Sequence, residues 1–275
     1  MDALPIPLIK RELQVGRFVI PYRICGGGTH GLVFVNGLQQ SMAMWHSFVR
    51  RFSPSYRIVI FDFPNHGRGR ILSGSADVSV EEQVDILDAV ADAANIKDQL
   101  TVCSASWGGV VAASYAVRHP RKVQRLILAS MGTRANEKMI EIISKGFEME
   151  PGDRTELAET IIETFGAGLP LSMKRKILRQ FQQMSQAALE AFHRHGLFVL
   201  AIRELGNAVD VSQIQCKTII LHGEKDTIVD AEDARFLASQ IQNSEFKNIA
   251  GVGHFLHLEN EEILDVYEDI LASPA

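Results

Sequence analysis

The chain has 275 residues, of which 46% are hydrophobic and 22% are charged. This composition excludes disordered, collagen-like and disulfide-scaffold proteins, and the length allows one large domain with an inserted subdomain. The 28 basic and 33 acidic side chains give a net charge of −5, which argues against a sequence-independent nucleic-acid binder.

Cysteine usage and hydropathy predict a cytoplasmic protein. The three cysteines, Cys25, Cys103 and Cys216, are odd in number and have no C-x-x-C spacing, so we expect neither a disulfide framework nor a zinc site. Residues 1–14 do not form a signal peptide pattern. The longest uncharged apolar run, residues 107–117, is too short to span a membrane. We expect no metal and no cofactor.

Short β-type runs open the chain at residues 8–15 and 17–24, and the glycines at 26–28 follow them. Further along, continuous apolar runs of strand length recur. Such runs are typical of strands in a sheet covered on both faces. They lie at residues 32–36, 57–61, 100–103, 123–128 and 217–221.

Helical patterns separate these strands. Ser79 followed by Glu82 resembles a capping box and predicts a helix start. Residues 230–241 and 261–271 are also amphipathic. Strand and helix therefore alternate, which predicts an α/β fold with a mainly parallel, doubly wound sheet that has helices on both faces.

The alternation stops between residues 132 and 207. Apolar residues recur there at three- and four-residue spacing, and proline and glycine residues interrupt the pattern. We interpret this segment as an inserted cap of about four helices. The predicted organisation is a first core part at 1–131, a helical cap at 132–207 and a second core part at 208–275.

The segment from Ser104 to Gly109 carries the strongest chemical signal. It follows an apolar strand, precedes a helical run and reads Ser-Ala-Ser-Trp-Gly-Gly. This fits a nucleophile elbow, in which Ser106 sits on a strained turn between small residues, because strand and helix backbones nearly touch there. The alternative is an ordinary Ser- and Gly-rich turn.

A serine nucleophile needs a base that an acid holds in place. Asp226 follows the strand run at 217–221, and His254 follows a short strand-like run at 246–250. We expect these two residues to supply the acid and the base. For the rival residues we favour structural roles, in helix capping, packing or hydrogen bonding; they are Glu224, Asp230, Asp233, His222 and His257, and also Cys103 and Ser104.

An acyl-transfer site also needs backbone N–H donors for the oxyanion. The loop after the strand at 32–36 and the elbow predict the N–H groups of Leu38 and Trp107 for this role. We nominate four further residues as substrate contacts: Asn36, Gly37, Arg70 and Ala105. For Arg70, a plain surface position is an equal alternative.

The sequence at this point resembles the α/β-hydrolase superfamily. The resemblance rests on Asn36-Gly37, on Phe61-Asp62-Phe63-Pro64 with Gly67 and Gly69, on the elbow, on His222-Gly223-x-x-Asp226 and on Gly253-His254. It covers nearly the whole chain apart from the cap. It implies the chain order serine, acid, histidine, which Ser106, Asp226 and His254 follow.

A narrower resemblance is to the bacterial rhamnolipid-precursor synthases, which are 3-(3-hydroxyalkanoyloxy)alkanoate synthases. It adds the segments 231–235 and 253–259 and the Ser106-Trp107 pair. Family members join two 3-hydroxyacyl chains that arrive as thioesters of acyl carrier protein or coenzyme A. The resemblance therefore implies serine acyl transfer. The alternatives are an esterase or thioesterase, and a non-catalytic ligand receptor on the same scaffold.

The cap supplies two weaker signals. Its methionine and phenylalanine side chains suit a flexible apolar substrate, with internal packing as the alternative. The basic runs at 174–176 and 193–195 suit an acidic acyl carrier protein or a coenzyme A phosphate, with a solvated helix face as the favoured alternative.

Overall fold

The computed structural model describes residues 8–96, 99–148, 154–202 and 204–274. The predicted apolar runs form the middle of a nine-stranded sheet. Five of its inner strands are buried along almost their whole length, whereas the edge strands β1 and β9 are largely accessible. This contrast is the physical reason why the inner strands read as continuous hydrophobic runs.

Strand order in the sheet is β1-β2-β4-β3-β6-β7-β8-β9, and β5 pairs with β2. The pairs β1·β2, β2·β4 and β2·β5 are antiparallel, and all pairs from β4 to β9 are parallel. The prediction of a mainly parallel sheet is confirmed. The strands are β1 Ile9–Val15, β2 Phe18–Cys25, β3 Gly31–Val35, β4 Arg57–Phe61, β5 Arg70–Ile71, β6 Leu100–Ala105, β7 Val123–Ala129, β8 Lys217–Gly223 and β9 Ser244–Ile249.

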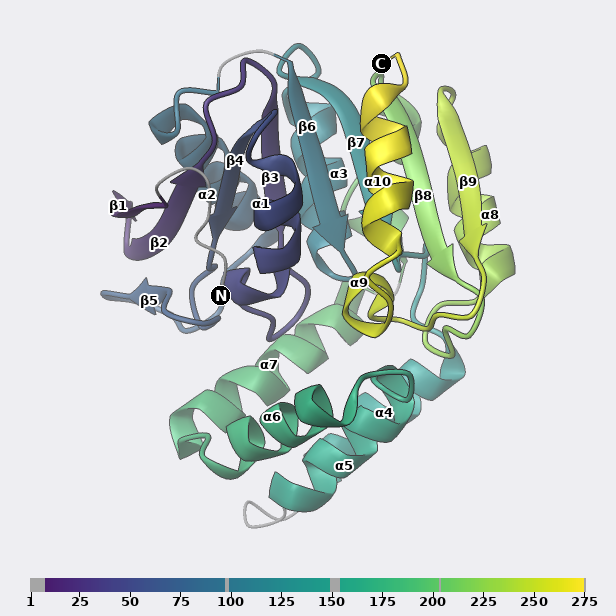
Figure 1. Ribbon diagram of the computed structural model, residues 1–275. Helices are drawn as coiled ribbons and strands as arrows, with labels where there is room; N and C mark the ends of the chain where they lie inside the picture. Colours follow the sequence, from purple (N-terminus) through teal and green to yellow (C-terminus); the bar gives the residue numbers. More distant parts are fainter. Residues whose placement is uncertain (1–7, 97–98, 149–153, 203, 275) are drawn as a thin grey trace.

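Helices cover both faces of the sheet, as predicted (Figure 1). One face packs against α2, α3 and α8, and the other against α1 and α10 with the short η1 and α9. Their bounds are η1 Met42–Trp45, α1 His46–Phe52, α2 Val80–Ala93, α3 Gly108–Arg118, α8 Ala231–Ser239, α9 Leu256–Glu259 and α10 Ile263–Ala272. The predicted capping box at the start of α2 is present, since Ser79 and Glu82 bond each other's backbone N–H.

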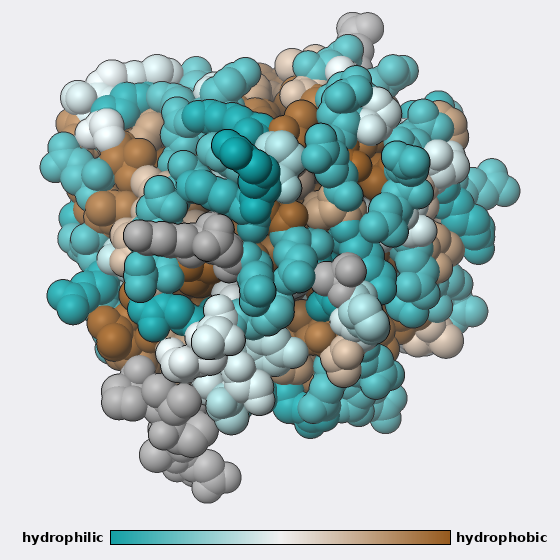
Figure 2. Space-filling model, turned by 90° about the horizontal axis from the view of Figure 1, so that it is seen from above, coloured by the Kyte–Doolittle hydropathy of each residue, from teal (hydrophilic) through white to brown (hydrophobic). Residues whose placement is uncertain are grey.

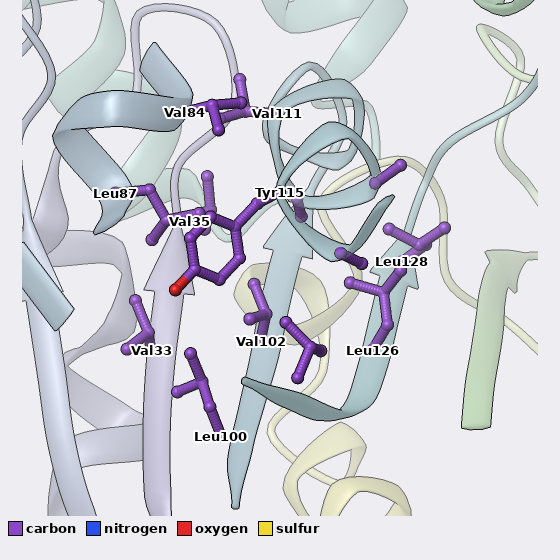
Figure 3. Packing of buried hydrophobic residues seen from close by; sticks show 14 of the residues in the cluster. Val33, Val35, Val84, Leu87, Leu100, Val102, Val111, Tyr115, Leu126 and Leu128 are labelled. Carbon is purple, nitrogen blue, oxygen red and sulfur yellow. The ribbon is translucent and has the colours of Figure 1, made fainter. Parts of the chain in front are cut away.

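The core on the α2–α3 face is built around a fully buried tyrosine. Figure 3 shows the Tyr115 ring among Val33 and Val35 of β3, Val102 of β6 and Leu87 of α2. Its hydroxyl donates a hydrogen bond of 3.0 Å to Asp88 at the edge of this cluster, so the polar end of the ring is satisfied. This layer fixes the elbow helix α3 against the sheet.

Four helices lie between β7 and β8 in the chain, where the sequence predicts the cap. In Figure 1 they form a layer beyond the carboxyl ends of β6, β7 and β8. A small apolar core of Leu157, Ala158, Phe181 and Leu189 holds the second, third and fourth of these helices together. The segment contains α4 Glu137–Glu148, α5 Arg154–Phe165, α6 Leu171–Gln182 and α7 Gln186–Ile202, followed by η2 Leu205–Asn207 and η3 Val211–Gln213.

The opposite end of the molecule has a different character. Figure 2 looks onto the molecule from above the view of Figure 1 and shows hydrophilic residues over most of this face, with smaller hydrophobic areas between them. The carboxyl ends of the parallel strands and the helical layer lie at the other end. In α/β sheets, ligands bind at the carboxyl ends of the strands, so a functional site is expected at that end.

Candidate active site

Ser106 lies in a sharp turn between β6 and α3. Its φ angle is +50°, in the left-handed region that non-glycine residues rarely adopt. Its N–H donates a hydrogen bond of 2.8 Å to the carbonyl of Ala129 in the neighbouring strand. The turn needs Gly108, because a Cβ atom there would lie 2.5 Å from the carbonyl oxygen of Asn36. The local geometry is therefore that of a nucleophile elbow.

Ser104 occupies the first small position of the elbow. Its side chain is fully buried, and its hydroxyl donates a hydrogen bond of 3.1 Å to the carbonyl oxygen of Ile127. A serine therefore fits where this motif usually has glycine, because the added hydroxyl finds a partner on β7.

Ser106, His254 and Asp226 form one hydrogen-bonded chain. His254 Nε2 lies 3.0 Å from Ser106 Oγ, and His254 Nδ1 lies 2.8 Å from Asp226 Oδ2. An ionised carboxylate only accepts hydrogen bonds, so we assign the proton of the neutral imidazole to Nδ1. The lone pair of Nε2 then faces the serine hydroxyl, as a general base requires.

The Asp226 carboxyl is shielded from water yet strongly hydrogen-bonded. Its side chain is 0% exposed and that of His254 is 3% exposed. Burial by itself would raise the pKa of Asp226, but the interaction with His254 and the N–H groups of Ile228 and Val229 outweigh burial, so the pKa lies below its usual value. Asp226 is therefore held ionised beside the imidazole.

Two side chains hold the histidine loop. The Ser130 hydroxyl donates to the carbonyl oxygen of His254 at 2.6 Å. Glu259 accepts hydrogen bonds from the N–H groups of Gly253 and Phe255, at 2.7 and 3.1 Å. Sequence analysis missed Ser130, which carries no motif of its own, and Glu259 appeared only as the end of a motif.

Leu38 and Trp107, whose N–H groups are nominated for the oxyanion, line the same cavity as Ser106. Within the described part of the chain, neither N–H donates to a protein acceptor. The N–H of Gly37 is by contrast occupied, since it donates to Gln40 Oε1 at 2.7 Å. The loop after β3 thus keeps the Leu38 N–H unpaired beside the elbow.

A cavity of about 720 Å³ lies over Ser106 and His254, between the core and the four-helix layer. This volume is within the range of small-molecule sites. The helical layer contributes mostly apolar side chains to its wall. They are Met139, Ile142, Ile143, Leu157, Ile161, Phe165, Leu169, Met173, Ile177, Phe181, Phe192, Val199 and Ile202.

The four residues nominated as substrate contacts are not among the described residues that line this cavity. The Asn36 side chain is buried, donates to the carbonyl oxygen of Phe61 and accepts from the Trp45 indole. Arg70 lies on the short edge strand β5, where it pairs with Glu12. We therefore do not retain Asn36, Arg70, Gly37 or Ala105 as substrate contacts.

The rival acids bond elsewhere in the structure. Asp233 accepts hydrogen bonds from the N–H and hydroxyl of Thr133. Asp230 stands at the N-cap position of α8 but makes no cap hydrogen bond. The Asp230 carboxylate accepts a hydrogen bond from the side-chain amide of Asn136. The third rival acid, Glu224, accepts one from the backbone N–H of Gly251.

The rival histidines are packed in the core. His257 stacks on Trp45 and bonds the carbonyl of Met44, and burial lowers its pKa to about 4. His222 stacks on Phe246, and burial lowers its pKa. Neither histidine lines the cavity among the described residues.

The elbow tryptophan is held from two sides. Its indole N–H donates to Gln83 of α2 at 3.2 Å, and its ring meets the edges of His195 and Phe198 of α7. Burial, with a smaller contribution from nearby His66, lowers the pKa of His195 to about 3. His195 is therefore neutral and adds no positive charge to the predicted basic run at 193–195.

Comparison with known proteins places this geometry in a family. The α/β-hydrolase fold model matches residues 32–261. The chain is 24% identical over 242 residues to an (R)-3-hydroxydecanoyl-ACP:CoA transacylase of Pseudomonas aeruginosa, covering 87% of this chain and 80% of the relative. It is 26% identical over 246 residues to a pimeloyl-[acyl-carrier protein] methyl ester esterase of Nitrosospira multiformis, covering 81% and 87%.

Among solved structures, the α/β-hydrolase enzyme MGS-M2 from a deep-sea metagenome library superposes with a TM-score of 0.83 at 18% identity, covering 96% of this chain and 98% of that one. None of the described helices is long and apolar enough to cross a membrane. The predicted resemblance to acyl-transferring relatives is confirmed at the level of sequence similarity. The chain belongs to the α/β-hydrolase fold family and is an enzyme of that fold.

Proposed function

We propose that this protein is a serine acyltransferase that joins 3-hydroxyacyl chains, delivered as thioesters, into a 3-(3-hydroxyalkanoyloxy)alkanoate. One observation carries the proposal: the hydrogen-bonded chain Ser106–His254–Asp226 lies at the base of an apolar cavity. In this site the serine attacks, the histidine moves the proton and the aspartate holds the histidine.

In the first half-reaction, His254 Nε2 takes the proton of Ser106 and Oγ bonds to the thioester carbonyl carbon. The N–H groups of Leu38 and Trp107 stabilise the resulting oxyanion. The carbon–sulfur bond then breaks, and the thiolate leaves with the proton from His254. The product of this step is an acyl-serine.

In the second half-reaction, the 3-hydroxyl of another chain gives its proton to His254 and its oxygen bonds to the acyl carbon. Ser106 leaves and recovers the proton, and an ester joins the two chains. The second chain is still a thioester at this point, and its hydrolysis by water releases the second thiol and the free alkanoate. Water in place of that hydroxyl makes the same site a thioesterase or esterase, because the triad serves either nucleophile. Exclusion of water from the cavity decides between them.

The support for an acyl substrate has two sources. The cavity wall is lined by flexible apolar side chains, including Met139 and Met173, which suit an alkyl chain. One relative is named for transfer of a 3-hydroxydecanoyl group between carriers, and another for hydrolysis of an acyl-carrier-protein-linked ester. Acyl transfer is common to the chemistry of both.

The test is product analysis by mass spectrometry. Purified protein receives 3-hydroxydecanoyl thioesters of carrier protein and of coenzyme A, in parallel with Ser106→Ala. A dimer ester made by the wild type alone is the expected result. Free 3-hydroxy acid as the sole product would assign hydrolysis instead. Absence of labelling by a serine-directed phosphonate would argue for a non-catalytic receptor.

A further inference from the structure

Positively charged side chains from the core and from the helical layer meet at the wall of the active-site cavity. Arg23 of β2 and Arg68 of the loop after β4 line it from the core. Lys176 lines it from α6, across the boundary between the two layers. The same cavity contains Ser106, so these cations and the nucleophile face one volume.

A neutral histidine holds the inner cation of this group. Arg23 Nη1 lies 3.0 Å from His46 Nε2. A guanidinium has only donors, so the imidazole nitrogen must accept, and His46 is neutral. Burial lowers the pKa of His46 first, and the charges of Arg23, Arg50 and Lys176 lower it further. The positive charges of Arg23, Arg50 and Lys176 thus all disfavour protonation of this one imidazole.

No carboxylate among the described residues forms an ion pair with this group. In the ranges that the structure describes, Arg23, Arg50, Arg68 and Lys176 have no carboxylate oxygen within the 4.0 Å of an ion pair. Asp62 lines the same cavity and interacts electrostatically with Arg23 and Arg68, but it is buried, and its two oxygens accept hydrogen bonds from the N–H groups of Met42 and Arg68. Several cations that share one cavity and have no ion-pair partner favour an external anion.

We propose that Arg23 and Lys176, with Arg68 on the wall of the same cavity, form a subsite for the phosphate of the arm that carries the acyl thioester. The inference rests on the proposed function: the apolar wall takes the acyl chain, Ser106 takes the thioester carbon, and the cations take the phosphate. A phosphopantetheine arm has this order of groups, whether coenzyme A or a carrier protein bears it. Arginine and lysine are the residues that bind phosphate most often.

The experiment compares two minimal substrates that differ only in the phosphate, the 3-hydroxydecanoyl thioesters of pantetheine and of 4′-phosphopantetheine. We expect wild-type kcat/KM to be about 10-fold or more higher for the phosphorylated thioester, through a lower KM, since charge-assisted hydrogen bonds are strong. This preference should shrink as ionic strength rises. Lys176→Gln and Arg23→Gln should each reduce the ratio of the two kcat/KM values several-fold.

Arg175→Gln is the matched control, because Arg175 is the neighbouring cation on α6 and is not among the described cavity-lining residues. It should keep the wild-type ratio. Lys176 is exposed, so its variant does not depend on refolding of the core. If wild-type protein turns over both thioesters at equal kcat/KM, the subsite is overturned and the proposed function stays intact. The same holds if Arg175→Gln reduces the ratio of the two kcat/KM values as much as Lys176→Gln does. Turnover of neither thioester overturns the proposed function itself. Repeating the comparison with coenzyme A and carrier-protein thioesters distinguishes the two sources of the phosphate.

Discussion

The Ser130 hydroxyl donates a hydrogen bond of 2.6 Å to the backbone carbonyl oxygen of His254, across 124 positions of sequence. Ser130 itself has a φ angle of +54°, and its N–H bonds the carbonyl of Leu221 in β8. The loop after β7 is thereby fixed between β8 and the histidine loop. We regard Ser130 as a positioning residue, since it acts through the backbone of His254.

Ser130→Ala should therefore reduce kcat about 5-fold, because a lost hydroxyl bond is worth about 1 kcal/mol. The pH at which activity is half-maximal should move with it if the imidazole is displaced. The matched control is Ser114→Ala, which removes a similar hydroxyl–carbonyl bond inside α3. An equal loss of kcat in both variants would contradict a positioning role for Ser130.

Asp226→Asn should reduce kcat about 10⁴-fold while leaving substrate binding largely unchanged. An amide can donate to Nδ1, which leaves the proton on Nε2 and removes the base. Pre-steady-state kinetics of acyl-serine formation would measure the loss. Glu224→Gln is the control, because Glu224 follows the same strand but bonds the Gly251 N–H. Comparable losses in both variants would point to Glu224 as part of the acid function.

Gly108→Ala should separate the elbow from β3. The new Cβ atom would lie 2.5 and 2.6 Å from the carbonyl oxygens of Asn36 and Val35. Such overpacking costs about 1–3 kcal/mol of unfolding free energy. We expect a lower melting temperature together with lower activity. Gly27→Ala meets no heavy atom within 4 Å and should change neither; an unchanged Gly108→Ala protein would show that the contact is relaxed in solution.

The free energy of unfolding should rise with pH between about 4 and 6.5. His257 is neutral in the folded protein because burial lowers its pKa to about 4, whereas the unfolded histidine titrates near 6.5. Between these values the unfolded state binds the extra proton, so the contribution of His257 to stability falls as pH is lowered through this window and is constant above it.

At pH 4, this effect of His257 should lower the free energy of unfolding by about 3 kcal/mol relative to pH 7. His257→Gln should flatten the pH dependence of the denaturation midpoint measured at several pH values, even though it also lowers stability at pH 7. His30→Gln offers a comparison at a partly exposed histidine. A slope unchanged by His257→Gln would mean that His257 is protonated in the folded state.

Much of the fold and the catalytic candidates could be predicted because their signals are local. The inner strands read as apolar runs, the capping box is four residues long, and the elbow motif spans Ser104 to Gly109. Asp226 and His254 stand directly after β8 and β9, so the parallel sheet brings them to the same end. Position after a strand was a sufficient guide for these residues.

The remaining contacts depend on distant parts of the chain. Asn36 was nominated as a substrate contact because it follows β3, but its side chain is taken by Phe61 and Trp45. The Trp107 indole finds Gln83 on another helix. Arg175 and Lys176 are adjacent basic residues, and no sequence pattern tells which of them faces the site. Of the two, only Lys176 is among the described cavity-lining residues. No local sequence pattern predicts these contacts, because they depend on tertiary packing, including that of the helical layer on the core.

Glu259 links the helical layer to the chemistry. Its carboxylate holds the backbone N–H groups on both sides of His254, and Gly168 in the turn between α5 and α6 approaches it so closely that a Cβ atom there would collide with the carboxylate. Any side chain larger than that of glycine at position 168 would have to displace this carboxylate. The turn between α5 and α6 therefore restricts where the histidine loop can lie, although the two segments are far apart in the sequence.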